Sequence, residues 1–188
     1  MLTRLEEFGE YAEIAGFKNV KMGHVEELLK QVFDNKPSNV EAQLFNAELV
    51  CTWQHLYFAA LDAFTAFRNN ANISKSVAME TVLYASAQRQ IRKATGLIGV
   101  KPASSSLALL IIGKESDAVE SALLTMSGRI HGQRDDGVLE LSKRKMEKIV
   151  RAYGVSKSEL ATVSDGKTRE EALTDLIIER MALLATER

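Results

Sequence analysis

The chain has little of what several classes of protein require. It has one cysteine in 188 residues, which excludes a disulfide framework or a cysteine-ligated metal cluster within the chain. That residue, Cys51, lies beside an apolar run, which favours a buried, inert thiol over a nucleophile. Lys and Arg number 24 against 25 Asp and Glu, a net charge of −1. No overall field therefore attracts polyanions, and any nucleic-acid contact must come from a local patch.

Long apolar runs are also missing, and residues 1–10 carry acids. We therefore expect neither a signal peptide nor a membrane span, no membrane partner, and a cytoplasmic location. Hydrophobic residues make up 46% and charged residues 26% of the chain, as in ordinary soluble globular proteins. We expect a single domain over residues 1–188, without internal repeats or low-complexity segments.

Motifs for catalysis are absent too. The sequence has no phosphate-binding glycine loop, dinucleotide fingerprint, zinc-protease motif or nucleophile elbow. Its three histidines lie far apart, without partners at metal-ligand spacing, so we expect no metal, no cofactor and no catalytic residues. Asp135 and Asp136 could hold a cation, although two acids in a polar turn are usually solvated. His55 fits a hydrogen-bonded structural histidine better than a catalytic base, and an acid–base pair with Glu80 stays open as the alternative.

Periodicity indicates the elements that are present. Helical spacing of apolar residues predicts helices over 24–35, 53–67, 77–95, 116–129, 143–153 and 169–186. Alternating or continuous apolar segments predict strands over 10–20, 40–51 and 107–112, a short edge strand over 138–141, and a loop or helical turn over 156–167. Both faces of 40–51 carry apolar residues, which requires either cover on both faces or a bulge near Phe45. The interleaving predicts an α+β fold with a small mixed, mainly antiparallel sheet covered by several helices.

The predicted helix 77–95 has two contrasting sides. One arc, which we expect to face the core, collects Met79, Leu83, Tyr84, Ala87, Ile91 and Ala94. The other side collects Gln88, Arg89 and Arg92 near the small residues Ala85 and Ser86, which would let a ligand approach closely. Glu80 points into the apolar arc, so we expect a hydrogen bond or a cation at its carboxylate. A solvated arginine face is the alternative interpretation.

The predicted last helix is apolar over more than half of its circumference. Its apolar residues are Ala172, Leu173, Leu176, Ile177, Ile178, Met181, Leu183 and Leu184. A helix that only covers its own domain needs a stripe of roughly 100°. The excess predicts a second surface, exposed for docking to a partner. The alternative is a terminal helix sunk between two elements of its own fold.

Several of these segments together resemble one family. They are AQLFNAELVCTWQHLYFAALDAF (42–64), the Asn72-Ile73-Ser74 entry, ME-x-x-LYAS-x-QRQI-x-x-A-x-x-x-IGVK (79–101), and DDGVLEL…K (from 135) before the apolar terminal helix. From about residue 10 to 185, the chain resembles the TPRKB-like, CGI-type family of small kinase-binding subunits of the KEOPS complex, in an archaeal-looking version. Ala87 departs from the pattern, because a glycine often follows Ala-Ser in such proteins. The first helix and 157–167 also look longer than in compact relatives.

The resemblance implies a non-catalytic subunit of the complex that makes threonylcarbamoyladenosine in tRNA. It implies direct binding of a small atypical kinase that acts as an ATPase, and indirect contact with the threonylcarbamoyl transferase subunit. In archaeal relatives the subunit also grips the single-stranded CCA 3′ end of tRNA, and such ends are held by cations and amides. A kinase-docking adaptor without RNA binding stays open.

Carried onto this sequence, the two roles fall on different segments. RNA binding is predicted for Lys75, Ser86, Gln88, Arg89, Gln90 and Arg92. Kinase docking is predicted for Leu173, Leu176, Ile177, Arg180, Leu183 and Leu184.

Overall fold

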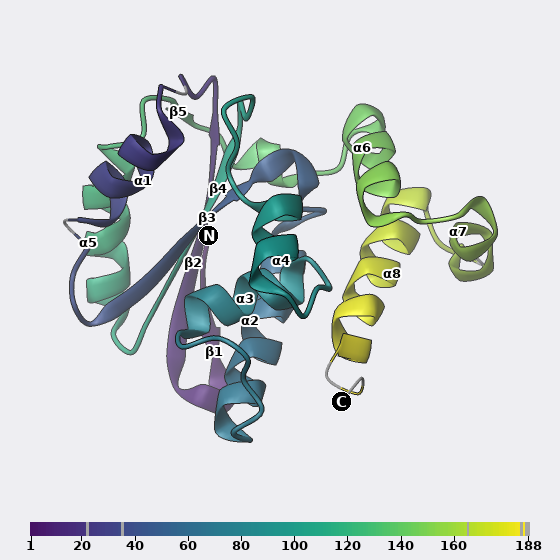
Figure 1. The fold of residues 1–188 in the computed structure, drawn as a ribbon, viewed down its shortest axis with the longest axis horizontal. Coiled ribbons are helices and arrows are strands. Elements are labelled where there is room, and N and C mark those ends of the chain that lie inside the picture. The colour runs from purple at the N-terminus through teal and green to yellow at the C-terminus, as the bar shows by residue number, and fades with distance from the viewer. Residues whose placement is uncertain (22, 35, 165, 185, 187–188) are drawn as a thin grey trace.

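An antiparallel sheet forms the centre of the computed structural model, which describes residues 1–21, 23–34, 36–164, 166–184 and 186 (Figure 1). Its strands, in the spatial order β1–β2–β4–β3, are β1 (Leu2–Leu5), β2 (Glu10–Lys18), β4 (Leu107–Gly113) and β3 (Val40–Asn46). The short strand β5 (Gln133–Arg134) pairs with the end of β2. Strand β4 is wholly buried, because its run LALLIIG pairs along both edges and is covered on both faces. The predicted α+β fold is confirmed, with every described strand pair antiparallel.

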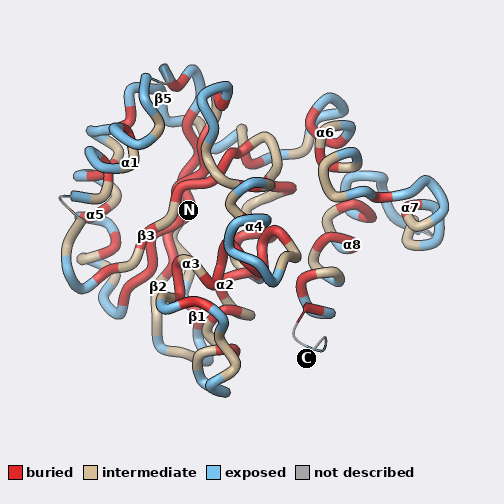
Figure 2. Tube along the Cα trace, viewed as in Figure 1, coloured by how far each residue is buried: buried red, intermediate tan, exposed pale blue. Residues whose placement is uncertain are grey.

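Helices cover both faces of this sheet. Helices α1 (Val25–Phe33) and α5 (Ser116–Ser127) cover one face, where they pack on Ala15 and Leu109. Helices α2 (Trp53–Arg68), α3 (Val77–Ala85) and α4 (Ile91–Ile98) cover the other, where they pack on Ile14 and Leu110. Neighbouring residues of one strand serve opposite cores because side chains alternate across a sheet. Figure 2 shows the buried strands between helices that expose their outer sides, apart from α3, which is buried almost throughout. We call the sheet with α1 to α5 the central body.

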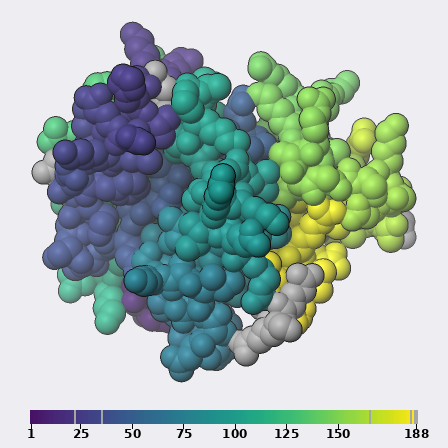
Figure 3. Space-filling view, in the orientation of Figure 1, coloured from purple at the N-terminus to yellow at the C-terminus, as the bar shows by residue number. Residues whose placement is uncertain are grey.

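A second unit, the carboxy-terminal layer, packs beside the central body. It consists of α6 (Lys143–Tyr153), α7 (Lys157–Val163) and α8 (Arg169–Leu184), drawn green to yellow in Figure 3. Its own small core includes Met146, Ile149, Leu160 and Ile177. The far end of α8 joins the core of the central body instead, through Met181 and Leu184. Within the described residues, no helix has the length and apolar character needed to cross a membrane.

Some predicted elements differ in detail. Strand β3 keeps a regular register with β4 through Phe45, without a bulge, and ends in the 3-10 helix η2 (Ala47–Leu49). The predicted edge strand over 138–141 is wrong: the 3-10 helix η3 (Asp136–Leu139) forms there, because the Asp135 carboxylate accepts a hydrogen bond from the Gly137 N–H and closes a turn. Residues 157–163 form α7. Strand β1, followed by the 3-10 helix η1 (Glu6–Phe8), was not predicted.

Candidate functional site

The predicted single helix over 77–95 is two helices, α3 and α4, joined by a turn at residues 86–90. Two backbone hydrogen bonds close the end of α3: the Ala87 N–H donates to the Tyr84 carbonyl, and the Gln88 N–H donates to the Leu83 carbonyl. This pair of bonds is a Schellman motif, in which the first residue after the helix cap adopts a left-handed backbone conformation. Ala87 takes that position, with φ +49°. The turn redirects the chain, so α4 packs beside α3 with Ala94 and Ile98 buried and residues 91–93 exposed.

This break decides which predicted RNA-binding residues reach solvent. Arg89, Gln90 and Arg92 are exposed, as is Lys75 in the loop before α3, and Gln88 is half-buried. Ser86 is 1% exposed and its hydroxyl donates to the Leu83 carbonyl. Ser86 and its neighbour Ala85 therefore offer no surface to a ligand, and that part of the prediction is wrong.

A small cavity of about 140 Å³ lies beside the turn. Its lining residues are Thr65, Ala66, Asn69, Ala71, Ile73, Glu80, Tyr84, Arg89 and Leu184. The Arg89 guanidinium also reaches the Leu184 carbonyl at the end of α8, at 3.5 Å. Arg89 therefore lies in the turn, lines the cavity and contacts the end of α8. The Tyr84 ring also lines the cavity, but it packs mainly in the core.

Glu80 and His55 are both buried, and each is bonded to the backbone. The Glu80 carboxylate accepts hydrogen bonds from the N–H groups of Ile73, at 3.1 and 3.0 Å, and Ser74, at 2.7 Å. His55 Nδ1 accepts from the Cys51 N–H, and its Nε2–H donates to the Ala85 carbonyl at 2.8 Å. The expected hydrogen bond to Glu80 is confirmed. The acid–base pair is not: the hydrogen bonds of both side chains go to backbone groups.

Burial shifts the pKa of His55 and of the nearby Cys51. Burial lowers the pKa of His55 to about 4, so the ring is neutral near pH 7. Burial likewise raises the pKa of the Cys51 thiol to about 12, as expected of an inert thiol. Among the residues that the structure describes, no three His, Cys, Asp or Glu side chains are grouped so that they could hold a metal ion. Asp135 pairs with Lys18 of β2, and the Asp136 carboxylate accepts a hydrogen bond from the Gly16 N–H of β2, so the two acids hold the 133–139 segment onto β2.

Helix α8 does not present the predicted kinase-docking residues as a set. Leu173 and Ile177 are fully buried, and Leu176 and Leu184 are 8% exposed, because α8 lies between the cores of the central body and the carboxy-terminal layer. The predicted exposure of these four side chains is therefore wrong. Of the predicted helix 169–186, Ala185 lies outside the described residues.

The two remaining predicted docking residues differ from each other. Leu183 is 51% exposed. Arg180 is half-buried and holds the layer together, since its guanidinium donates to the Tyr153 carbonyl and to the Glu159 carboxylate, each at 2.6 Å. With the hydrogen bonds from Ser156, this contact lowers the pKa of Glu159 to about 2.

An open groove follows another side of α8. This α2–α8 groove, of about 470 Å³, has apolar walls from Trp53, Phe58, Leu139, Leu141 and Ile178 and acids from Glu140, Glu170, Glu171 and Asp175. Phe58 is 39% exposed. The Thr52 hydroxyl, at the N-cap of α2, is buried without a hydrogen-bond partner among the described residues. Sequence analysis did not identify this groove, although Phe58 is a large apolar residue off the buried stripe of α2.

Comparison with known proteins gives this arrangement its context. A family model described as "Kinase binding protein CGI-121" matches residues 17–185. The chain belongs to the CGI-121 family. "Regulatory protein Cgi121" of Methanocaldococcus jannaschii is 31% identical over 109 residues, which are 58% of this chain and 66% of that protein. The match therefore spans just under two thirds of that relative's length.

Membership of the CGI-121 family confirms the resemblance and directs attention to protein-binding surfaces. The matched range takes in the turn at 86–90, the α2–α8 groove and almost all of the carboxy-terminal layer. In this CGI-121 chain the α2–α8 groove is an accessible surface with apolar walls.

Proposed function

We propose that this protein is a non-catalytic subunit of a KEOPS-type complex that makes threonylcarbamoyladenosine in tRNA. It would bind a small atypical kinase directly and help to recruit tRNA through the CCA 3′ end. The observation that carries the proposal is the match of residues 17–185 to the kinase-binding CGI-121 family. By binding the kinase, the subunit would lie near the threonylcarbamoyl transferase. Tethering tRNA there would raise the effective concentration of tRNA at the transferase.

For the kinase, the α2–α8 groove fits better than the buried leucines of α8. Its aromatic and aliphatic walls offer the kind of anchors that contribute most to protein interfaces. Asp175 pairs with Lys167, and the other three acids of the groove would complement a basic segment on the kinase and speed association. Phe58 and Ile178 are the most direct reporters, because they line the groove without being fully buried.

Co-elution with the kinase tests this assignment. We expect Ile178→Glu and Phe58→Glu each to abolish co-elution while the circular dichroism spectrum stays that of the parent protein. Leu124→Glu is the matched control, because Leu124 is 76% exposed on α5, on the opposite face of the sheet. Retained co-elution of both groove variants would contradict docking in this groove.

For RNA, the exposed cations around the turn carry the proposal. Three cations here are exposed: Arg92 on α4, Arg89 in the turn and Lys75 in the loop before α3. Exposed cations bind the phosphates of RNA. Asn69 and the exposed Gln90 add amides, and the cavity beside Arg89 gives a recess next to them. An adaptor without RNA binding is the second candidate, favoured by the contact of Arg89 with Leu184.

A gel shift with intact tRNA and with tRNA lacking CCA separates the two candidates. We expect tighter binding of intact tRNA and a weakening of about 1–2 kcal/mol for Arg92→Glu. Arg89→Glu should weaken binding too, but its contact with α8 makes Arg92 the cleaner probe. Arg129→Glu is the control, because Arg129 is an exposed cation just after α5, on the other face of the sheet. Equal binding of the two tRNAs, unaffected by Arg92→Glu, would leave only the adaptor.

A further inference from the structure

A second groove lies within the carboxy-terminal layer, between α6, α7 and the first turn of α8. This α6–α7 groove, of about 390 Å³, is lined by Lys143, Met146, Glu147, Val150, Ser156, Lys157, Leu160, Arg169 and Glu170. Met146, Val150 and Leu160 form its apolar floor, on the outer side of the layer's small core. Only Glu170 also lines the α2–α8 groove, so the two grooves meet at the start of α8.

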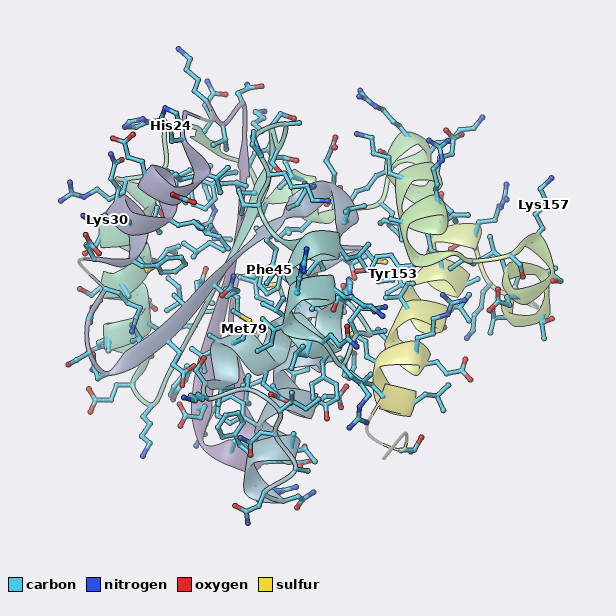
Figure 4. The ribbon with its side chains drawn as sticks, in the orientation of Figure 1. His24, Lys30, Phe45, Met79, Tyr153 and Lys157 are labelled. Atoms are coloured by element: carbon cyan, nitrogen blue, oxygen red, sulfur yellow. The ribbon has the colours of Figure 1, made fainter. Side chains whose placement is uncertain are left out.

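The rim of the α6–α7 groove is mainly basic. Lys143, Lys157 and Arg169 come from three different segments, and all three are exposed. Figure 4 shows Lys157 extending outward from α7. None of the three makes an ion pair with an acid in the described part of the chain, whereas other cations of the layer do: Lys148 with Glu48, Lys167 with Asp175 and Arg180 with Glu159. The rim cations are therefore available to a partner.

The walls of this groove are held in place before any partner arrives. Ser156 and Glu159 form a capping box at the start of α7, and Glu159 also pairs with Arg180 of α8. Arg180 in turn donates to the Tyr153 carbonyl at the end of α6. One arginine thus ties all three helices together, and a preorganised groove loses less entropy on binding.

We propose that the α6–α7 groove docks an amphipathic helix of a partner protein, apolar on one face and acidic along its edges. The floor of two aliphatic side chains and one methionine suits leucine or isoleucine at helical spacing, since methionine adapts to the shape of its neighbour. The three rim cations complement carboxylates on the edges of such a helix. RNA fits less well, because no aromatic residue lines the groove for base stacking.

Selection from a displayed library of helical peptides tests the proposal on the full-length protein. Peptides are selected on the parent protein and counter-selected on Lys157→Glu/Arg169→Glu. We expect enrichment of peptides with apolar residues at i, i+3 or i+4 and i+7 and a net negative charge. Fluorescence anisotropy then compares the best peptide with a version whose Asp and Glu are replaced by Lys, which we expect to bind at least tenfold more weakly.

Two variants separate the groove from the general charge of the layer. Lys157→Glu/Arg169→Glu should weaken the selected peptide by at least tenfold, and Val150→Glu should do the same through the floor. Arg151→Glu is the matched control on α6, exposed but outside the groove, and should change affinity by less than about twofold. Thermal unfolding of each variant confirms that the layer stays folded.

Three outcomes would overturn the proposal. The first is an acidic peptide that binds no better than its Lys version. The second is an Arg151→Glu variant that weakens binding as much as the rim variant, which would indicate a nonspecific field. The third is a single-stranded RNA that binds the parent protein, displaces the peptide and loses affinity in Lys157→Glu/Arg169→Glu, which would make the groove an RNA surface. None of these depends on kinase docking in the α2–α8 groove.

Discussion

The central body and the carboxy-terminal layer use their polar side chains differently. In the central body, Glu80 is 1% exposed and satisfies two loop N–H groups, while His55 joins the start of α2 to the end of α3. In the carboxy-terminal layer, Lys143, Lys157 and Arg169 stand along the rim of a groove. These buried polar groups of the body fix its own loops, whereas the rim cations of the layer stay accessible to a partner.

The boundary between these two regions is where recognition surfaces arise. The Tyr153 hydroxyl of α6 lies within hydrogen-bond distance of the Ala85 carbonyl, at 2.9 Å, and the Leu49 carbonyl, at 3.2 Å. Arg89 reaches across to α8, and the α2–α8 groove opens along the same boundary. A small layer packed on a large body leaves grooves because neither unit covers the other completely. If this comparison holds, changes in the body should lower overall stability, and changes at the boundary should loosen the layer.

The largest effect should come from the buried acid of the body. Glu80→Ala removes the acceptor of the Ile73 and Ser74 N–H groups, so we expect the free energy of unfolding to fall by about 3 kcal/mol. Urea unfolding measures it. Glu120→Ala, at an exposed position of α5, should change it by less than about 0.5 kcal/mol. A loss below about 1 kcal/mol for Glu80→Ala would mean that the loop does not depend on this carboxylate.

Acid should weaken the body through His55. Its pKa falls from 6.5 to about 4 on folding, so the unfolded chain binds the proton first as the pH falls from 6.5 to 4. Stability should therefore drop by about 3 kcal/mol over that range. Burial raises the pKa of Asp62 from 3.8 to about 6, which opposes this loss. The measurement is therefore urea unfolding against pH in Asp62→Asn and in Asp62→Asn/His55→Gln, and equal pH slopes in the two would contradict the role of His55.

The Tyr153 hydroxyl provides a test of the boundary between the central body and the carboxy-terminal layer. Tyr153→Phe removes the hydrogen bond from α6 to the body, and we expect a loss of about 1 kcal/mol. Amide hydrogen exchange should quicken in α6, α7 and α8 while β4 stays protected, because the layer opens separately from the sheet. Tyr57→Phe is the control, since no hydrogen bond of the Tyr57 hydroxyl to a described residue is present and its ring packs on Trp53 and Phe58. Equal quickening in β4 would show that body and layer unfold as one unit.

How much of the fold and the candidate site could be predicted depends on whether a local sequence pattern is compatible with one structure or with several. Helix α2 and strand β4 were predictable because a long stripe and a continuous apolar run each specify one structure. The burial of α8 was not, since a helix wedged between two cores and a helix that docks a partner show the same broad apolar surface. The cavity beside Arg89 was also unpredictable, because it brings together residues from α2, the turn and α8 that no local pattern connects.

The break at 86–90 is the instructive failure, and it leads to the smallest predicted effect. The residues on either side keep a helical phase, with Leu83 and Ala94 both buried, and Ala87 carries no turn signal of its own. Yet Ala87 has φ +49°, which disfavours alanine by about 1 kcal/mol relative to glycine. Ala87→Gly should therefore raise the free energy of unfolding by about 0.5–1 kcal/mol.

The sign of that change makes the test decisive. Glycine usually destabilises a helix interior, so Ala182→Gly, at an exposed position of α8, should lower the free energy of unfolding by about 1 kcal/mol in the same urea titration. Opposite signs for the two substitutions would establish the left-handed turn between α3 and α4. A loss of stability in both variants would mean that helix α3 continues through residue 87. The exposure of Arg89 and Arg92, on which the RNA proposal depends, would then have to be reconsidered.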